Sequence, residues 1–107
     1  MNIQENIEEA PKGAQFYIDK VSEIKECAKA LINNDSPKSL EAQRALFWAN
    51  AVLAGLKEMP DVPSSELEDR YLEFFERWYS EPSHLSREIL EAYVDAIKEE
   101  LEAREEN

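Results

Sequence analysis

The spacing of hydrophobic residues predicts four helices. Over residues 14–32, apolar side chains recur at steps of four and three, which places them on one face of an α-helix. Similar periodicity predicts helices over about 37–58, 66–79 and 84–104. The stretches between them are short and rich in Pro, Asn, Asp and Ser, the residues of turns and helix caps. No segment has the alternating pattern of a strand, so the sequence predicts an all-α fold, a small antiparallel helical bundle.

The length predicts one domain. At 107 residues, the chain is long enough to form a single hydrophobic core. We expect residues 1–13 to be a flexible N-terminal tail and residues 14–107 to form a single helical domain. With only Gly13 and Gly55 in the chain, no Gly-rich phosphate-binding loop can be formed.

The second predicted helix, 37–58, is apolar on nearly all sides. Its polar residues form only a thin stripe, seven residues apart, at Gln43, Asn50 and Lys57. A helix of this kind is normally buried nearly all round. We therefore expect it either to be central in the bundle or to use its second face against another copy or another protein. The candidate oligomer interface on that second face consists of Phe47, Trp48, Ala51 and Gly55.

The third predicted helix is the most aromatic. Leu67, Tyr71, Phe74 and Trp78 form its core face, and Phe75 and Tyr79 widen that face at its flank. We expect this cluster to belong mainly to the core, with the two flanking rings half exposed.

Negative charge is concentrated in the C-terminal half of the chain. Residues 1–57 contain eight acids and seven bases, whereas residues 58–107 contain sixteen acids and five bases, so net charges of −1 and −11 make up the total of −12. Such an excess opposes compact folding by self-repulsion, so it calls for an explanation. Two explanations remain open: a solvated face that keeps the protein soluble, or a surface that binds a cationic partner.

One continuous acidic stripe on the fourth predicted helix is the main candidate binding surface. Its residues recur at steps of three and four, opposite the apolar face, and few bases are interleaved with them. Acids on the outer face of the third helix extend the candidate surface. The full set of candidate partner-binding residues is Glu88, Glu91, Asp95, Glu99, Glu102, Asp69, Glu73 and Glu76.

Sequence features typical of enzymes are weak. Glu73-x-x-Glu76 and Glu88-x-x-Glu91 resemble the paired carboxylates of all-α nucleoside-triphosphate pyrophosphohydrolases, which hold magnesium on inward-facing acids. About five such pairs are expected from the acidic composition alone, however, and these acids lie opposite the apolar faces. The lone His84 and lone Cys27 are too few for a zinc or di-iron site. We therefore predict no enzymatic activity, no cofactor and no metal.

These observations predict a cytoplasmic protein that binds another protein. A single cysteine excludes an intrachain disulfide, and no secretory signal or membrane span is apparent. A strongly acidic chain is repelled by nucleic acid and anionic lipid, so we expect neither as a direct ligand. The predicted function is to bind and inhibit a basic protein, as a nucleic-acid mimic of the anti-defence or anti-restriction type of a phage. The alternatives are a homo-oligomeric structural or regulatory protein, with a homodimer as its simplest form, and an immunity or antitoxin protein for a basic toxin.

Overall fold

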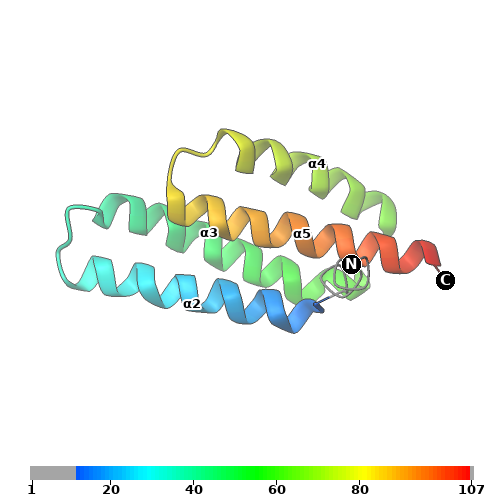
Figure 1. Ribbon diagram of the computed structural model, residues 1–107, viewed down its shortest axis with the longest axis horizontal. Helices are drawn as coiled ribbons and strands as arrows, with labels where there is room; N and C mark the ends of the chain where they lie inside the picture. Colours follow the sequence, from blue (N-terminus) through cyan, green and yellow to red (C-terminus); the bar gives the residue numbers. More distant parts are fainter. Residues whose placement is uncertain (1–11, 107) are drawn as a thin grey trace, which may run out of the picture.

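The protein is an all-α antiparallel bundle, as the sequence predicts. The computed structural model describes residues 12–106, which contain four α-helices and no strand. In Figure 1 each helix runs opposite to the one before it. The helices are α2 (Ala14–Asn33), α3 (Ser39–Glu58), α4 (Ser64–Ser80) and α5 (His84–Glu106), with a 3-10 turn η1 (Met59–Asp61) between α3 and α4. Residues 1–11 of the predicted tail lie outside the described residues.

Helix boundaries differ from the predicted ones where proline and serine shape the turns. The expected start of α3 at residue 37 is two residues early, because Ser36 Oγ accepts a hydrogen bond from the Lys38 N–H and holds a turn over 36–39. Helix α4 starts at Ser64, because the extended Pro63 supplies the carbonyl that accepts the Leu67 N–H. None of the helices in residues 12–106 has the length and hydropathy that crossing a membrane requires.

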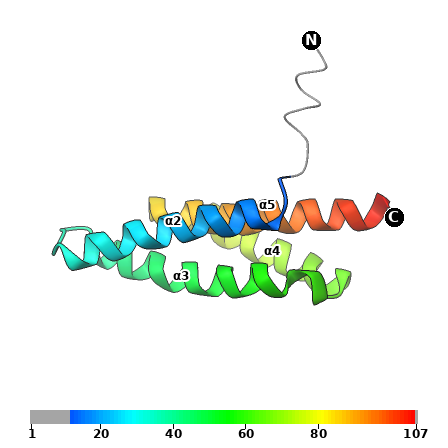
Figure 2. The ribbon, with the colours of Figure 1, turned by 90° about the horizontal axis from the view of Figure 1, so that it is seen from below.

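Helix α5, not α3, is the central helix of the bundle. It packs against α2, α3 and α4, whereas α4 packs mainly on α5. Figure 2 shows α2 and α5 together in one layer, with α3 and the sloping α4 below them. The buried apolar residues of α5 accordingly face in several directions: Ile89, Leu90, Ala92, Tyr93, Val94, Ala96 and Ile97.

The outer face of α3 is exposed, although the helix is apolar nearly all round. Leu40 is 77% exposed and Phe47 is 65% exposed, while Ala42, Ala45 and Ala49 are fully buried. The expectation that α3 could be the central helix is therefore wrong. Its small buried alanines bring α2 and α5 close on one side, and no further helix of the described chain covers the other side.

Gly55 lets α3 approach α5 closely. A Cβ added at Gly55 would overlap the hydroxyl group of Tyr93, which is itself buried. The Tyr93 hydroxyl also accepts a hydrogen bond from Arg70 Nη1 of α4 at 2.9 Å. Arg70 forms ion pairs with Glu58 (2.8 Å) and Glu66 (2.6 Å), so this one guanidinium joins α3, α4 and α5.

Candidate protein-binding surfaces

Glu99, one of the predicted partner-binding residues, forms hydrogen bonds with other residues of the bundle. Its Oε1 accepts the backbone N–H groups of Lys12 (3.1 Å) and Gly13 (3.3 Å), at the start of α2. Its Oε2 accepts the hydroxyl of Tyr17. Burial of Tyr17, together with this bond to Glu99, raises the pKa of the Tyr17 hydroxyl. Glu99 thus holds the start of α2 against α5, and it is only partly exposed.

Basic groups lie near two further members of the α5 stripe. Glu88 forms an ion pair with His84 when that imidazole is protonated, with Nε2 and Oε2 2.7 Å apart. Partial burial of the Asp95 carboxylate, together with the negative charge of Glu91, raises the pKa of Asp95. The positive charges of Lys20 and Lys98 lower that pKa. Glu91 and Glu102 are exposed. The stripe is therefore continuous in sequence but is interrupted in space by cations from α2 and α5.

Four of the five acids of α4 are exposed and form no ion pair within residues 12–106, while the fifth, Glu66, pairs with Arg70. Asp69, Glu73 and Glu76 were predicted as partner-binding residues, and Glu68 joins them on the same helix. None of these four carboxylates forms an ion pair with another residue in the described part of the chain. The two cations of α4 are directed elsewhere, since Arg70 binds Glu58 and Glu66 and Arg77 stacks over Trp48.

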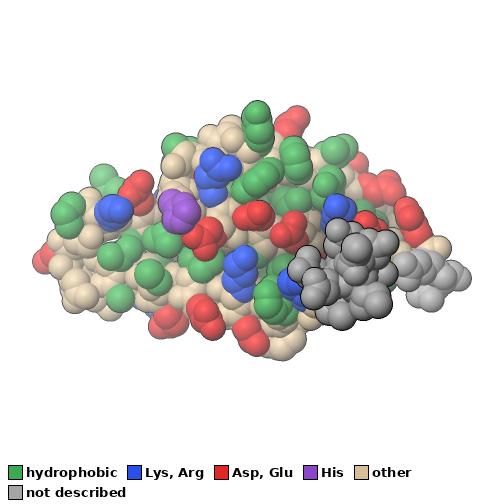
Figure 3. All heavy atoms as spheres, viewed as in Figure 1, with side chains coloured by type: hydrophobic (Ala, Val, Ile, Leu, Met, Phe, Trp, Pro, Cys, Tyr) green, Lys and Arg blue, Asp and Glu red, His purple; other side chains and the backbone are tan. Residues whose placement is uncertain are grey.

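Large apolar side chains are exposed among these acids. On α4, Leu72 is 64% exposed, Tyr79 is 75% exposed and Phe75 is 39% exposed. Phe75 also contacts Tyr71 and Trp78, with ring centroids 5.9 and 5.3 Å apart. Only Leu67 of α4 is fully buried. The predicted core cluster therefore contributes partly to the core and partly to the exposed surface. Figure 3 shows hydrophobic side chains gathered over α4.

Glu91 and Asp95 of α5 lie on the side of that helix opposite Tyr93. Tyr93 marks the side of α5 that faces α3 and α4, because its ring contacts Phe74 with centroids 4.8 Å apart. Glu91 and Asp95 are each two residues from Tyr93, so they lie about 200° around the helix. Figure 3 shows the acids of α5 on the front face with basic side chains among them. The stripe of α5 therefore lies away from Tyr93, although Glu88 and Glu91 also line a pocket with Trp78 of α4.

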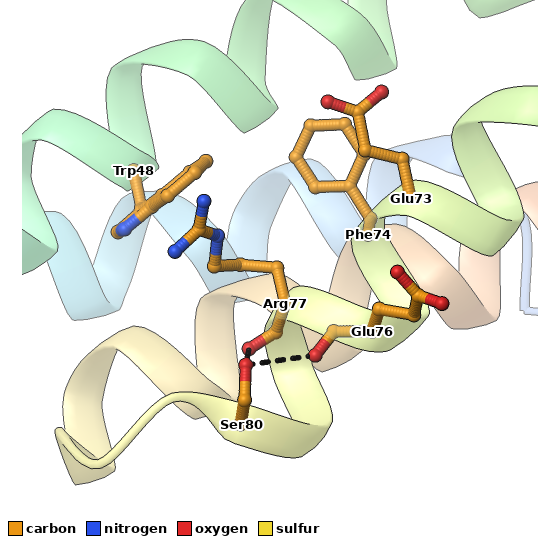
Figure 4. Close-up of a pocket in the computed structure, with 6 residues that line it drawn as sticks. All are labelled: Trp48, Glu73, Phe74, Glu76, Arg77 and Ser80. Carbon is orange, nitrogen blue, oxygen red and sulfur yellow. Dashed lines mark hydrogen bonds between the residues drawn. The ribbon is translucent and has the colours of Figure 1, made fainter.

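A pocket of about 330 Å³ lies between α3 and α4. Its aromatic walls are Trp48 of α3 and Phe74 of α4, whose rings meet edge to face with centroids 6.0 Å apart. Figure 4 shows Arg77 reaching from α4 toward the Trp48 ring, with its guanidinium carbon 5.4 Å from the ring centroid. The rest of the lining consists of Glu73, Glu76 and Ser80. The Ser80 hydroxyl donates a hydrogen bond to the backbone carbonyl of Glu76 at 3.0 Å.

The four residues of the candidate oligomer interface separate into exposed and internal ones. Phe47 and Ala51 are exposed on α3, and Trp48 is half-buried beside Phe47, with ring centroids 5.2 Å apart. Gly55 is buried beneath Tyr93 of the same chain, so its contact partner is internal. Leu40 lies on the exposed face with Phe47 and was not predicted as part of it.

Metal-ligating side chains do not gather in the described part of the chain. No group of three or more His, Cys, Asp or Glu residues is placed to hold an ion. The buried Glu81 is bound at both oxygens by Arg44, at 2.6 and 3.0 Å, so it joins α3 to the segment between α4 and α5. Cys27 is exposed.

Comparison of the chain with protein-family models, with curated proteins and with solved structures gives no match.

Proposed function

We propose that this is a non-enzymatic protein that binds and inhibits a basic protein partner, and that α4 is its main contact surface. One observation carries the proposal. Four exposed carboxylates that form no ion pair within residues 12–106 share one helix with three exposed large apolar side chains.

Both parts of this surface have a role in binding. Aromatic and aliphatic side chains at the centre of an interface supply most of its affinity, and charges around them select and steer the partner. A solvated helix that served only solubility would gain nothing from exposing Leu72 and Tyr79, which are 64% and 75% exposed. The acids indicate that the partner surface is rich in Lys and Arg.

A Lys- and Arg-rich surface of this kind is what proteins use to contact nucleic-acid phosphates. A protein that covers it with carboxylates blocks nucleic acid, which is the proposed mode of inhibition. An immunity or antitoxin protein for a basic toxin would act through the same contacts. Only the identity of the partner separates these two forms of the proposal.

The test compares two variants with equal charge changes on the two acidic faces. The α4 variant is Glu68→Gln, Glu73→Gln and Glu76→Gln, and the α5 variant is Glu91→Gln, Asp95→Asn and Glu102→Gln. Each removes three negative charges from exposed positions. Tagged wild-type and variant proteins are incubated with lysate and eluted in salt steps, and bound proteins are identified by mass spectrometry.

We expect the wild type and the α5 variant to retain a strongly basic protein that is released by moderate salt, because salt screens exposed charges. The α4 variant should lose it. Equal retention by both variants, or capture of proteins that are not basic, would contradict the proposal.

A second candidate function, homo-oligomerisation, is favoured by the exposed face of α3. Leu40 and Phe47 are large, apolar and mostly exposed there. Light scattering over a range of concentrations tests it, with Ala51→Glu as the disrupting change. A wild-type mass equal to one chain at every concentration would rule this candidate out.

A further inference from the structure

The pocket between α3 and α4 already holds a guanidinium group. The planar group of Arg77 lies 5.4 Å from the centroid of the Trp48 ring, a cation–π geometry. Arg77 is exposed and forms no ion pair within the described residues, although Glu73 is four positions before it on the same helix. Figure 4 shows Arg77 directed to Trp48 rather than to either glutamate.

The remaining lining suits a cation. Phe74 provides a second aromatic ring at 6.0 Å from Trp48, and Glu73 and Glu76 also line the pocket, with the Glu76 carboxylate directed away from Arg77 in Figure 4. Aromatic rings beside carboxylates are a typical environment for cationic side chains, since ring quadrupoles and negative charges both attract them. Neither glutamate is neutralised by an ion pair in the described part of the chain.

We propose that this pocket binds an arginine side chain of the basic partner, and that Arg77 occupies its place until the partner binds. This inference rests on the proposed function and adds to it a point of recognition. Arg77 acts as an internal competitor, because it covers the Trp48 ring. The partner's guanidinium displaces it, attracted to the pocket by the negative charges of Glu73 and Glu76.

Arginine fits this pocket better than lysine. A guanidinium is planar and weakly hydrated, so it stacks on an aromatic ring and forms forked bonds to carboxylates, whereas an ammonium is a compact, strongly hydrated point charge. The inference therefore predicts a preference for arginine, which long-range attraction between opposite charges does not explain.

The other side of α4 provides a matched control. Arg87 of α5 lies 5.6 Å from the centroid of the Trp78 ring, so it too is a cation stacked on a tryptophan. Its neighbour Glu88 contacts His84, with Oε2 2.7 Å from Nε2. Arg77→Gln and Arg87→Gln each remove one positive charge and one stacked cation, and they differ in whether the pocket between α3 and α4 is opened.

The experiment measures binding of a labelled synthetic peptide of twelve residues, four of them arginine and the rest mainly alanine. Versions with lysine and with citrulline replace the arginines. Fluorescence anisotropy gives the affinity for the full-length wild type, Arg77→Gln, Arg87→Gln and Trp48→Leu. Emission of Trp48, measured in a Trp78→Phe background, reports where the peptide binds.

Binding to Arg77→Gln should be about three- to sixfold tighter than to the wild type, since removing a competitor of cation–π strength frees the ring. Arg87→Gln should leave the response of Trp48 emission to the peptide unchanged, because Arg87 stacks on Trp78 and not on Trp48. Trp48→Leu should weaken binding about five- to tenfold, the lysine peptide should bind less tightly, and the arginine peptide should shift Trp48 emission.

Two results overturn the inference in distinguishable ways. If Arg77→Gln and Arg87→Gln strengthen binding equally and lysine binds as well as arginine, the attraction is only long-range, and the proposed function stands without this pocket. If no version binds the arginine peptide even at low salt, both the pocket and the proposed basic partner are wrong.

Discussion

Helices α4 and α5 have closely similar compositions and opposite uses. Helix α4 contains five acids and two bases, and α5 contains eight acids and three bases, so the ratio of charges is nearly the same. Yet α5 packs against three helices and is buried on most sides, while α4 packs mainly against α5. The number of neighbours, more than the composition, decides which acids are available to a partner.

The difference extends to individual carboxylates. On α5, Glu99 holds the start of α2, and Glu88 contacts His84. On α4, Glu73 and Glu76 form no ion pair with another residue in the described part of the chain. Four sets of substitutions test this comparison, and the first is expected to have the largest effect on stability.

The same substitution should have unequal effects in the two helices. Leu90→Ala on α5 empties a fully buried position and should lower the free energy of unfolding by about 3 kcal/mol. Leu72→Ala on α4, at a position 64% exposed, should change it by less than about 0.5 kcal/mol. Urea denaturation measures both. Similar losses would show that α4 contributes to the core as much as α5 does.

Among the side-chain contacts of α4, those of Arg70 should contribute most to holding this helix on the bundle. Arg70→Gln removes the hydrogen bond to the buried Tyr93 hydroxyl and the ion pairs with Glu58 and Glu66. We expect a loss of about 1–2 kcal/mol, and faster hydrogen exchange in α4 than in α2. Arg77→Gln, on the same helix, loses only its exposed stacking on Trp48 and should cost less, about 0.5 kcal/mol. Uniform acceleration across all helices would mean that α4 does not loosen separately.

The internal role of Glu99 sets it apart from the exposed acids. Glu99→Gln should cost about 1 kcal/mol, because the charged acceptor of the Lys12 and Gly13 N–H groups and of the Tyr17 hydroxyl is lost. Glu76→Gln, with the same change in charge, should leave the melting temperature nearly unchanged. Thermal unfolding followed by circular dichroism compares them. Two equal shifts would mean that only overall charge matters.

The smallest expected effect is at Asp95. Partial burial and Glu91 raise the folded-state pKa of Asp95, so its ionised form is less favourable in the folded protein than in the unfolded chain. Asp95→Asn should therefore stabilise the protein at pH 7, by less than about 0.5 kcal/mol because the residue is exposed. The gain should disappear as the pH falls through the folded-state pKa toward the unfolded value of about 4. A gain that persists at pH 3 would assign the effect to another cause.

The hydrophobic period predicted the four helices because each has at least one strongly apolar face. It could not identify the central helix, since α3 is apolar nearly all round and α5 carries the long acidic stripe. The small buried residues of α3, Ala42, Ala45 and Ala49, were the available signal, because small residues allow close helix approach while Phe47 and Leu40 remain outside. The packing of the helices determines which helix is central, and the hydrophobic pattern of a single sequence does not specify that packing.

The exposure of part of the candidate surface was predicted, while its role in binding stays a prediction. The sequence identified Asp69, Glu73 and Glu76, and the structure leaves all three exposed. It could not separate them from Glu99, because the groups that bind Glu99 lie more than 80 residues away along the chain. Leu72 had a signal that was overlooked: it is an apolar residue outside the core-facing positions of its helix. The pocket beside Trp48 could not be predicted, since it depends on how α3 and α4 lie together.

The attachment of α4 at its two ends has an evolutionary consequence. Near its start, Ser64 Oγ accepts a hydrogen bond from Arg104 at 3.0 Å, and just beyond its end the buried Glu81 binds Arg44. Because these contacts fix the helix at its ends, the exposed residues between them can be exchanged at little cost to stability. Selection can therefore change that face rapidly, as happens when two proteins evolve against each other, while α5 stays constrained. Among descendants of this sequence, α4 should diverge fastest on its outer face and keep Ser64, Arg70 and Glu81.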